Sequence, residues 1–128
     1  MLIEDRLKYL KIALYTIGAI LIVGVPLLMM IWHDGFGWDP AQPEYERMIM
    51  GIYVTLGVFL ILAAKDPLAN RSLIWFTVWS SLVHGGIMLV QAIVDDTERV
   101  NLVGDVPALF IVAAVLAFLM PKGGEATT

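Results

Sequence analysis

The sequence predicts an all-α fold: an integral membrane, antiparallel four-helix transmembrane bundle that forms a single domain over residues 1–128. Three observations predict this fold. Hydrophobic residues make up 59% of the chain, only 16% of the residues are charged, and the mean hydropathy is +0.82. The apolar residues form four uncharged stretches, and the basic residues gather in alternate connections between them. A soluble chain of this length could not bury so much apolar surface, whereas a bilayer can.

The four apolar stretches predict membrane spans at about 12–32, 48–64, 72–94 and 104–120. An α-helix rises about 1.5 Å per residue, so a hydrocarbon core of about 30 Å requires about 20 residues. The first and third stretches satisfy this length. The second and fourth are shorter, so we expect them to recruit flanking residues or to be matched by local thinning of the bilayer.

Helix-breaking and capping residues predict where the spans end or bend. Pro67 forbids continuation of the second span, Asn70 is expected to cap the third, and Asp105 is expected to cap the fourth. Within the first span, Pro26 cannot donate a hydrogen bond to the carbonyl of Ile22 and therefore predicts a kink.

The basic residues predict the orientation of the spans. Six of the eight lie before the first span, between the second and third spans, or after the fourth. The positive-inside rule therefore places both termini in the cytoplasm, and we expect a multi-pass protein of the bacterial inner membrane. The larger group comprises Arg6, Lys8, Lys11, Lys65, Arg71 and Lys122, and the smaller comprises Arg47 and Arg99.

The third span carries most of the polar residues that enter the membrane. His84 and Gln91 recur at helical spacing with three hydroxyl residues, Thr77, Ser80 and Ser81. Thr77, Ser81 and Gly85 also form a stripe of small residues at intervals of four, a pattern that lets helices approach closely in lipid. We expect this span to be the most buried of the four.

Small residues surround the expected depth of His84. This histidine lies about 18 Å along its helix from Ser72, near the bilayer midplane. The same depth on the second span falls at Gly57, and Tyr53 lies one turn outward on the same face. The corresponding residues on the first and fourth spans are Val23, Gly24, Ala113 and Ala114. Either the helices cross closely here or a small cavity lies between them.

His84, Tyr53 and Gln91 are the candidate binding residues, as the polar groups of a midplane pocket. In this interpretation His84 anchors a small molecule, ligates a cofactor or relays protons. In the alternative, His84 is neutral, bonds to Tyr53, Thr55 or a backbone carbonyl, and only fixes the helix register. The sequence identifies no cofactor, and a bis-histidine haem is disfavoured because His33, the second histidine, lies at the far end of the first span.

Other kinds of chemistry find little support in the sequence. The chain has no cysteine, and its net charge of −4 provides no basic patch for nucleic acid. A cation bridging Asp95, Asp96 and Glu98 is less favoured than a solvated loop, so no metal site is predicted. No span interior carries Lys, Arg, Asp or Glu, which argues against an active transporter. We expect no catalytic residues and no enzyme activity.

Three segments carry a resemblance to a known family. They are MGIYVTLGVF at 50–59, NRSLI at 70–74 and WSSLVHG at 79–85. The chain resembles an uncharacterised family of small bacterial four-span membrane proteins, and in general layout it is similar to DoxX-like four-helix proteins. The resemblance implies a four-span topology and a bacterial source, and it implies no activity.

Three hypotheses about function follow from the sequence. The first is a small non-catalytic accessory or self-associating subunit, packed in the bilayer with a membrane-protein partner or a second copy of itself. The second is a midplane binding module for a lipid, quinone or pigment that uses His84. The third is a passive pore or small transporter, which needs a continuous polar path.

Overall fold

The computed structural model describes residues 2–36 and 43–121, and its secondary structure in this part of the chain is entirely helical. Four helical segments are long and apolar enough to cross a membrane: Ile3–Ile31, Glu44–Ala63, Pro67–Val94 and Asp96–Leu119. The predicted all-α, four-span fold is confirmed. The elements are α1 (Ile3–Ala19), the π-helix η1 (Ile20–Gly24), α2 (Val25–Ile31), α3 (His33–Phe36), α4 (Pro43–Ala63), the 3₁₀-helix η2 (Pro67–Asn70), α5 (Arg71–Val94), the 3₁₀-helix η3 (Asp96–Leu102) and α6 (Asp105–Leu119).

Both short spans gain length from their flanks, as expected. Helix α4 begins at Pro43 rather than near residue 48 and reaches 21 residues, about 32 Å of helix. Helix α6 has 15 residues and is preceded by the 3₁₀-helix η3. The first span starts nearer the N-terminus than predicted, because the lead-in is continuous with α1 from Ile3.

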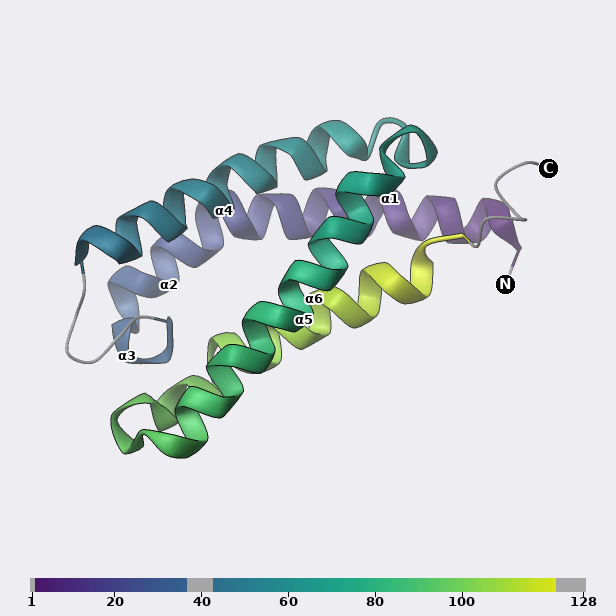
Figure 1. Ribbon diagram of the computed structural model, residues 1–128. Helices are drawn as coiled ribbons and strands as arrows, with labels where there is room; N and C mark the ends of the chain where they lie inside the picture. The colour runs from purple at the N-terminus through teal and green to yellow at the C-terminus, as the bar shows by residue number, and fades with distance from the viewer. Residues whose placement is uncertain (1, 37–42, 122–128) are drawn as a thin grey trace.

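The disturbance predicted at Pro26 takes the form of a π-helical segment. Pro26 has no N–H to donate to Ile22, and the N–H of Val25 bonds to the carbonyl of Ile20, five residues back. Residues Ile20–Gly24 form one wide turn, and α2 turns away from the axis of α1 (Figure 1). The irregularity therefore lies on the N-terminal side of the proline.

Two arginines hold the start of α1 and the start of α5 to the end of α6. Arg6 Nη1 donates to the carbonyl of Phe118 at 2.6 Å, with its guanidinium over the Phe118 ring. Arg71 Nη2 donates to the carbonyl of Pro121 at 2.9 Å. Cations suit the unpaired carbonyls at a helix C-terminus. One end of the bundle, here called the inner end, thus gathers these three helix termini.

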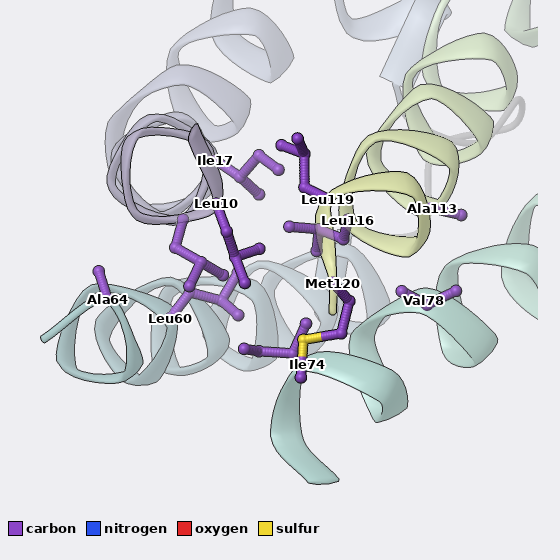
Figure 2. Close-up of a cluster of buried hydrophobic side chains, with 11 residues drawn as sticks. Leu10, Ile17, Leu60, Ala64, Ile74, Val78, Ala113, Leu116, Leu119 and Met120 are labelled. Carbon is purple, nitrogen blue, oxygen red and sulfur yellow. The ribbon is translucent and has the colours of Figure 1, made fainter. Parts of the chain in front are cut away.

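The close-packed core lies in the inner half of the bundle. Figure 2 shows side chains from all four spans meeting there. These residues are separated by three or four positions along their helices, so each span contributes one apolar face. The core comprises Leu10, Leu14, Ile17, Leu60, Ala64, Ile74, Val78, Ala113, Leu116, Leu119 and Met120.

The helices associate as two pairs, α1 with α4 and α5 with α6. A Cβ atom on Gly57 would lie 2.7 Å from the carbonyl oxygen of Gly18, so glycine is required where α1 and α4 cross. Sequence reasoning placed Gly24 or Val23 at this level of the first span, whereas Gly57 lies against Gly18, Leu21 and Ile22. Gly85 on α5 packs against Leu109 and Phe110 of α6.

The span containing α5 has the largest buried share of the four, and its Thr77–Ser81–Gly85 stripe is buried, as predicted. Although consecutive in the chain, α4 and α5 diverge from the loop that joins them and make few mutual contacts (Figure 1). The two pairs are thus packed together at the inner end and separate toward the other end, here called the outer end.

At the outer end, α3 lies against η3 and joins the two pairs. A Cβ atom on Gly104 would overlap the backbone of Gly35, so the chain segments touch there.

Asp95 accepts hydrogen bonds from the hydroxyl and the N–H of Thr97, which lower the pKa of Asp95. Because the folded-state pKa is depressed, the stability that this contact adds is present at neutral pH. That stability is lost as the pH falls through the folded-state pKa of Asp95.

The remaining carboxylates of η3 bond within their own turn rather than converging on a cation. Asp96 pairs with Arg99 at 2.8 Å, and Glu98 accepts from Asn101 at 2.7 Å. Within residues 2–36 and 43–121, no three His, Cys, Asp or Glu side chains come together in a way that could hold a metal ion.

Of the two predicted caps, Asn70 occupies the N-cap position of α5 without a side-chain capping bond, and the cap predicted at Asp105 is wrong. Asp105 lies inside the first turn of α6 and Gly104 occupies the cap position. Asn70 stands at the cap of α5 but donates backward to the carbonyl of Asp66, whose own carboxylate caps η2 through Ala69. The 3₁₀ turn before α5 redirects the asparagine. Lys122, one of the basic residues that predict the orientation, lies outside the described residues.

Candidate functional site

A cavity of about 110 Å³ lies between the two helix pairs, on the outer side of the close-packed core. All four spans contribute to its wall, because α4 and α5 separate just where the core ends. Most of the lining is apolar and includes the sulfur-bearing side chains of Met29 and Met88. The polar lining residues are Glu46, Tyr53, Thr77, Ser81, His84 and Asp105.

The polar centre of the cavity is a hydrogen bond between α4 and α5. The Tyr53 hydroxyl lies 2.5 Å from Nδ1 of His84, and the two rings are nearly parallel, with an interplanar angle of 15° and centroids 5.9 Å apart. Both side chains are half-buried. Of the partners considered for His84, Tyr53 is the one found, since the hydroxyl of Thr55 bonds to the carbonyl of Gly51 in its own helix.

Helical spacing explains how these residues reach one cavity. On α4 the lining residues Glu46, Ile49, Tyr53 and Leu56 are separated by three or four positions and share one face. On α5 the same spacing aligns Thr77, Ser81, His84 and Met88. The hydroxyl of Thr77 bonds to the carbonyl of Leu73 within the helix. His84 therefore supplies the interhelical polar contact of this face.

Gln91 does not join the other two predicted residues. It is exposed and is not part of the cavity lining. Its spacing of seven from His84 was expected to place it on the same face. However, Gln91 lies two turns farther along α5, toward the end at which α4 has diverged from α5 (Figure 1), and it does not line the cavity.

Sequence reasoning missed two carboxylates of the site, because Glu46 falls just before the predicted second span and Asp105 was expected only to cap the fourth. Glu46 is buried, and its two carboxylate oxygens each lie 2.9 Å from His33 Nε2. This contact joins α3 to α4. The sequence contains a signal that could have identified Glu46 as a site residue. Glu46 lies seven residues before Tyr53 and therefore lies on the same face of the helix.

The second missed carboxylate is Asp105, the first residue of α6. Its Oδ1 atom is buried and has no hydrogen-bond partner among the residues that the structure describes. A buried acceptor without a partner is costly, and native proteins leave few such atoms. Asp105 therefore lines the cavity and carries an unpaired acceptor just beneath its surface.

The π-helical segment also belongs to the site. Ile20 and Leu21 in η1 and Val25 just after it line the cavity. Single π turns within α-helices are rare and recur at functional sites, because they change which side chains face a pocket. Here the wide turn brings apolar side chains of the first span to the wall of the cavity that contains the Tyr53–His84 pair.

The arrangement suits hydrogen bonding to a small ligand in an apolar setting. No Lys or Arg side chain belongs to the cavity lining, so the site is not built for an anion. His33 pairs with Glu46 and is not part of the lining, so the two histidines do not face one ligand.

Comparison with known proteins assigns a family and no activity. A sequence model described as a family of unknown function (DUF6632) matches residues 5–127. Neither a curated protein nor a solved structure matches the chain. The expected resemblance to an uncharacterised family is thereby confirmed, whereas the bacterial source and the DoxX-like layout remain predictions.

Proposed function

The chain belongs to the family of unknown function DUF6632, and from its geometry we propose that it is a membrane-embedded binding module for a lipid-soluble small molecule. The observation that carries this proposal is the apolar cavity of about 110 Å³ around the Tyr53–His84 hydrogen bond. The module acts by holding its ligand, and the proposal includes no catalytic step.

The composition of the cavity supports ligand binding. Small-molecule sites are concave, mostly apolar, and furnished with a few polar groups that orient the ligand. Leaving such a cavity empty costs stability in proportion to its volume. A cavity of about 150 Å³ accommodates benzene in an engineered protein. The observed volume therefore suits one compact ring or head group, with any tail outside the cavity.

Filling the cavity tests this proposal. Val112 lines the cavity on α6, and its neighbour Ile111 is exposed on the outer face of the same helix. We expect Val112→Phe to displace the ligand, because the larger ring occupies its volume, and Ile111→Phe to leave binding intact. Native mass spectrometry of gently purified protein should detect a bound small molecule in wild type and Ile111→Phe only. Equal spectra for the three proteins would refute the proposal.

A second candidate function is that of an accessory or self-associating subunit. Gly51 is exposed on α4 with open space where a side chain would extend, and Thr55, one turn later, is also exposed. Small residues on a lipid-facing surface permit close packing by a helix of another subunit. The same native mass spectra bear on this candidate, since it requires a dimer or a retained protein partner.

We also propose that both termini face the cytoplasm of a bacterial cell. Arg6 and Arg71 lie together at the inner end, and the positive-inside rule assigns that end to the cytoplasm. Reporter fusions after residue 128 and within 96–102 are expected to report opposite sides of the inner membrane, the first cytoplasmic. A periplasmic signal from the C-terminal fusion would reverse the orientation.

A further inference from the structure

Resting on the proposed function, we infer that the cavity selects a lipophilic phenol or hydroquinone, whose ring fills the cavity and whose hydroxyl groups bond to Asp105 and His84. The inference combines three properties of the cavity: an unused acceptor, an unused donor and room for one ring.

The acceptor is Oδ1 of Asp105. It is buried at the start of α6 and lacks a hydrogen-bond partner among the residues that the structure describes. An ionised carboxylate only accepts hydrogen bonds. Because Asp105 lines the cavity while this oxygen lies beneath its surface, the carboxylate must turn toward the cavity to meet a ligand. A ligand that donates a hydrogen bond to it then removes the cost of the unpaired atom, whereas a ligand that presents only acceptors sets its lone pairs against those of the carboxylate.

The donor is Nε2 of His84. We assign the phenolic O–H of Tyr53 as the donor to Nδ1, because the O–H group would otherwise lack an acceptor among the described residues. A neutral imidazole with an acceptor Nδ1 carries its hydrogen on Nε2. Within the described residues, Tyr53 is the sole hydrogen-bond partner of His84. The Nε2–H group is thus available to an oxygen atom of the ligand.

The ligand must therefore both donate and accept, and a hydroxyl group does both. A lipophilic amine cation would satisfy Asp105 but has no lone pair to accept from Nε2–H. An anionic head group would face the carboxylates of Asp105 and Glu46 without a lining Lys or Arg. The volume of about 110 Å³ limits the head group to about one ring.

This geometry distinguishes the two redox forms of one ring. The hydroquinone carries two O–H donors, whereas the quinone, which has lost two electrons and two protons, carries only carbonyl acceptors. The cavity is expected to hold the reduced form and to reject the oxidised form, because a site built to bond a hydroxyl discriminates strongly against its absence. Binding alone is inferred, with no electron transfer.

The test uses purified protein in nanodiscs under anaerobic conditions, at pH about 8 so that aspartate is ionised. The probes are a decyl-tailed benzoquinone, its hydroquinone, and the hydroquinone dimethyl ether, which keeps the ring but lacks donors. We expect the hydroquinone to bind about 10- to 100-fold more tightly than the other two. In Asp105→Asn the amide can donate to a quinone carbonyl, so the preference should fall to within about threefold. Asp96→Asn, a matched change at the exposed Asp96, should retain it.

The outcomes separate this inference from the proposed function. Equal binding of all three probes, lost in Val112→Phe, would overturn the inference and leave the binding module standing. A preference for hydroquinone that survives in Asp105→Asn would overturn the role of Asp105. Absence of binding by every probe, together with native spectra that show no retained molecule, would overturn both.

Discussion

Gly57→Ala is expected to force α1 and α4 apart and to lower the free energy of unfolding by about 1–3 kcal/mol. The added Cβ would lie 2.7 Å from the carbonyl oxygen of Gly18 and 2.8 Å from the Ile22 side chain. The first of these neighbours is backbone, so it cannot move aside without shifting a whole helix. Unfolding in mixed micelles at increasing SDS concentration measures the loss.

Gly51→Ala is the matched control on the same helix. Nothing lies within 4 Å of the position that its Cβ would take. The substitution should therefore be neutral or should stabilise α4 by about 0.5–1 kcal/mol, because alanine is the better helix former. Equal effects of the two substitutions would show that the Gly18–Gly57 crossing does not govern the stability of the first helix pair.

Tyr53→Phe is expected to cost about 1–3 kcal/mol and to weaken ligand retention, because it removes the hydrogen bond to His84 Nδ1 while leaving the ring in place. The loss of the phenolic donor also releases the imidazole tautomer that keeps Nε2–H available. Thermal melts and native mass spectra of the same preparations measure the two effects. Tyr15→Phe, at a half-exposed tyrosine on α1, serves as the control for loss of a hydroxyl.

A double-mutant cycle with His84→Gln isolates this contact. If His84 serves only to fix helix register, the glutamine amide should preserve the fold and the bound molecule. If His84 bonds the ligand, His84→Gln should change ligand affinity while the helices persist. Additive stability losses in the double variant, with no coupling beyond about 0.3–0.5 kcal/mol, would mean that the two side chains do not interact in the membrane.

The four spans were predictable because the lipid core requires a long stretch of uncharged, apolar residues, and the sequence contains four such stretches. The exact ends of the spans were not predictable. Helix α4 begins at Pro43 and α1 begins at Ile3, so both helices include charged residues that a search for uncharged stretches leaves out. Likewise, α1 crosses α4 at Gly18 rather than at Val23 or Gly24, because the first span begins at Ile3, nearer the N-terminus than the uncharged stretch indicates.

The candidate site was predictable to the extent that it lies at one depth on straight helices. Counting along the second and third spans brought Tyr53 and His84 together correctly. It failed for Gln91, because the divergence of α4 from α5 is a property of packing rather than of either helix. Residue counting also failed for Glu46 and Asp105. A carboxylate near the predicted end of a span is expected to be solvated, and only the tertiary structure shows that Glu46 and the Oδ1 atom of Asp105 are buried.

The π-helical segment of the first span has a consequence for changes in chain length. A π turn is equivalent to an α-helix that has absorbed one inserted residue. Removing a single residue from Ile20–Gly24 would restore α-helical geometry with little rotation of α2 relative to α1, because five residues of a π turn cover roughly the same angle and rise as four residues of an α-helix. Val25 and Met29 would then stay at the cavity, and the core around Leu14 would stay in place. Removing a residue from the regular helix α2 would instead rotate every residue beyond it by about 100°. The π turn is thus the place where the first span can lose one residue with the least effect on the pocket.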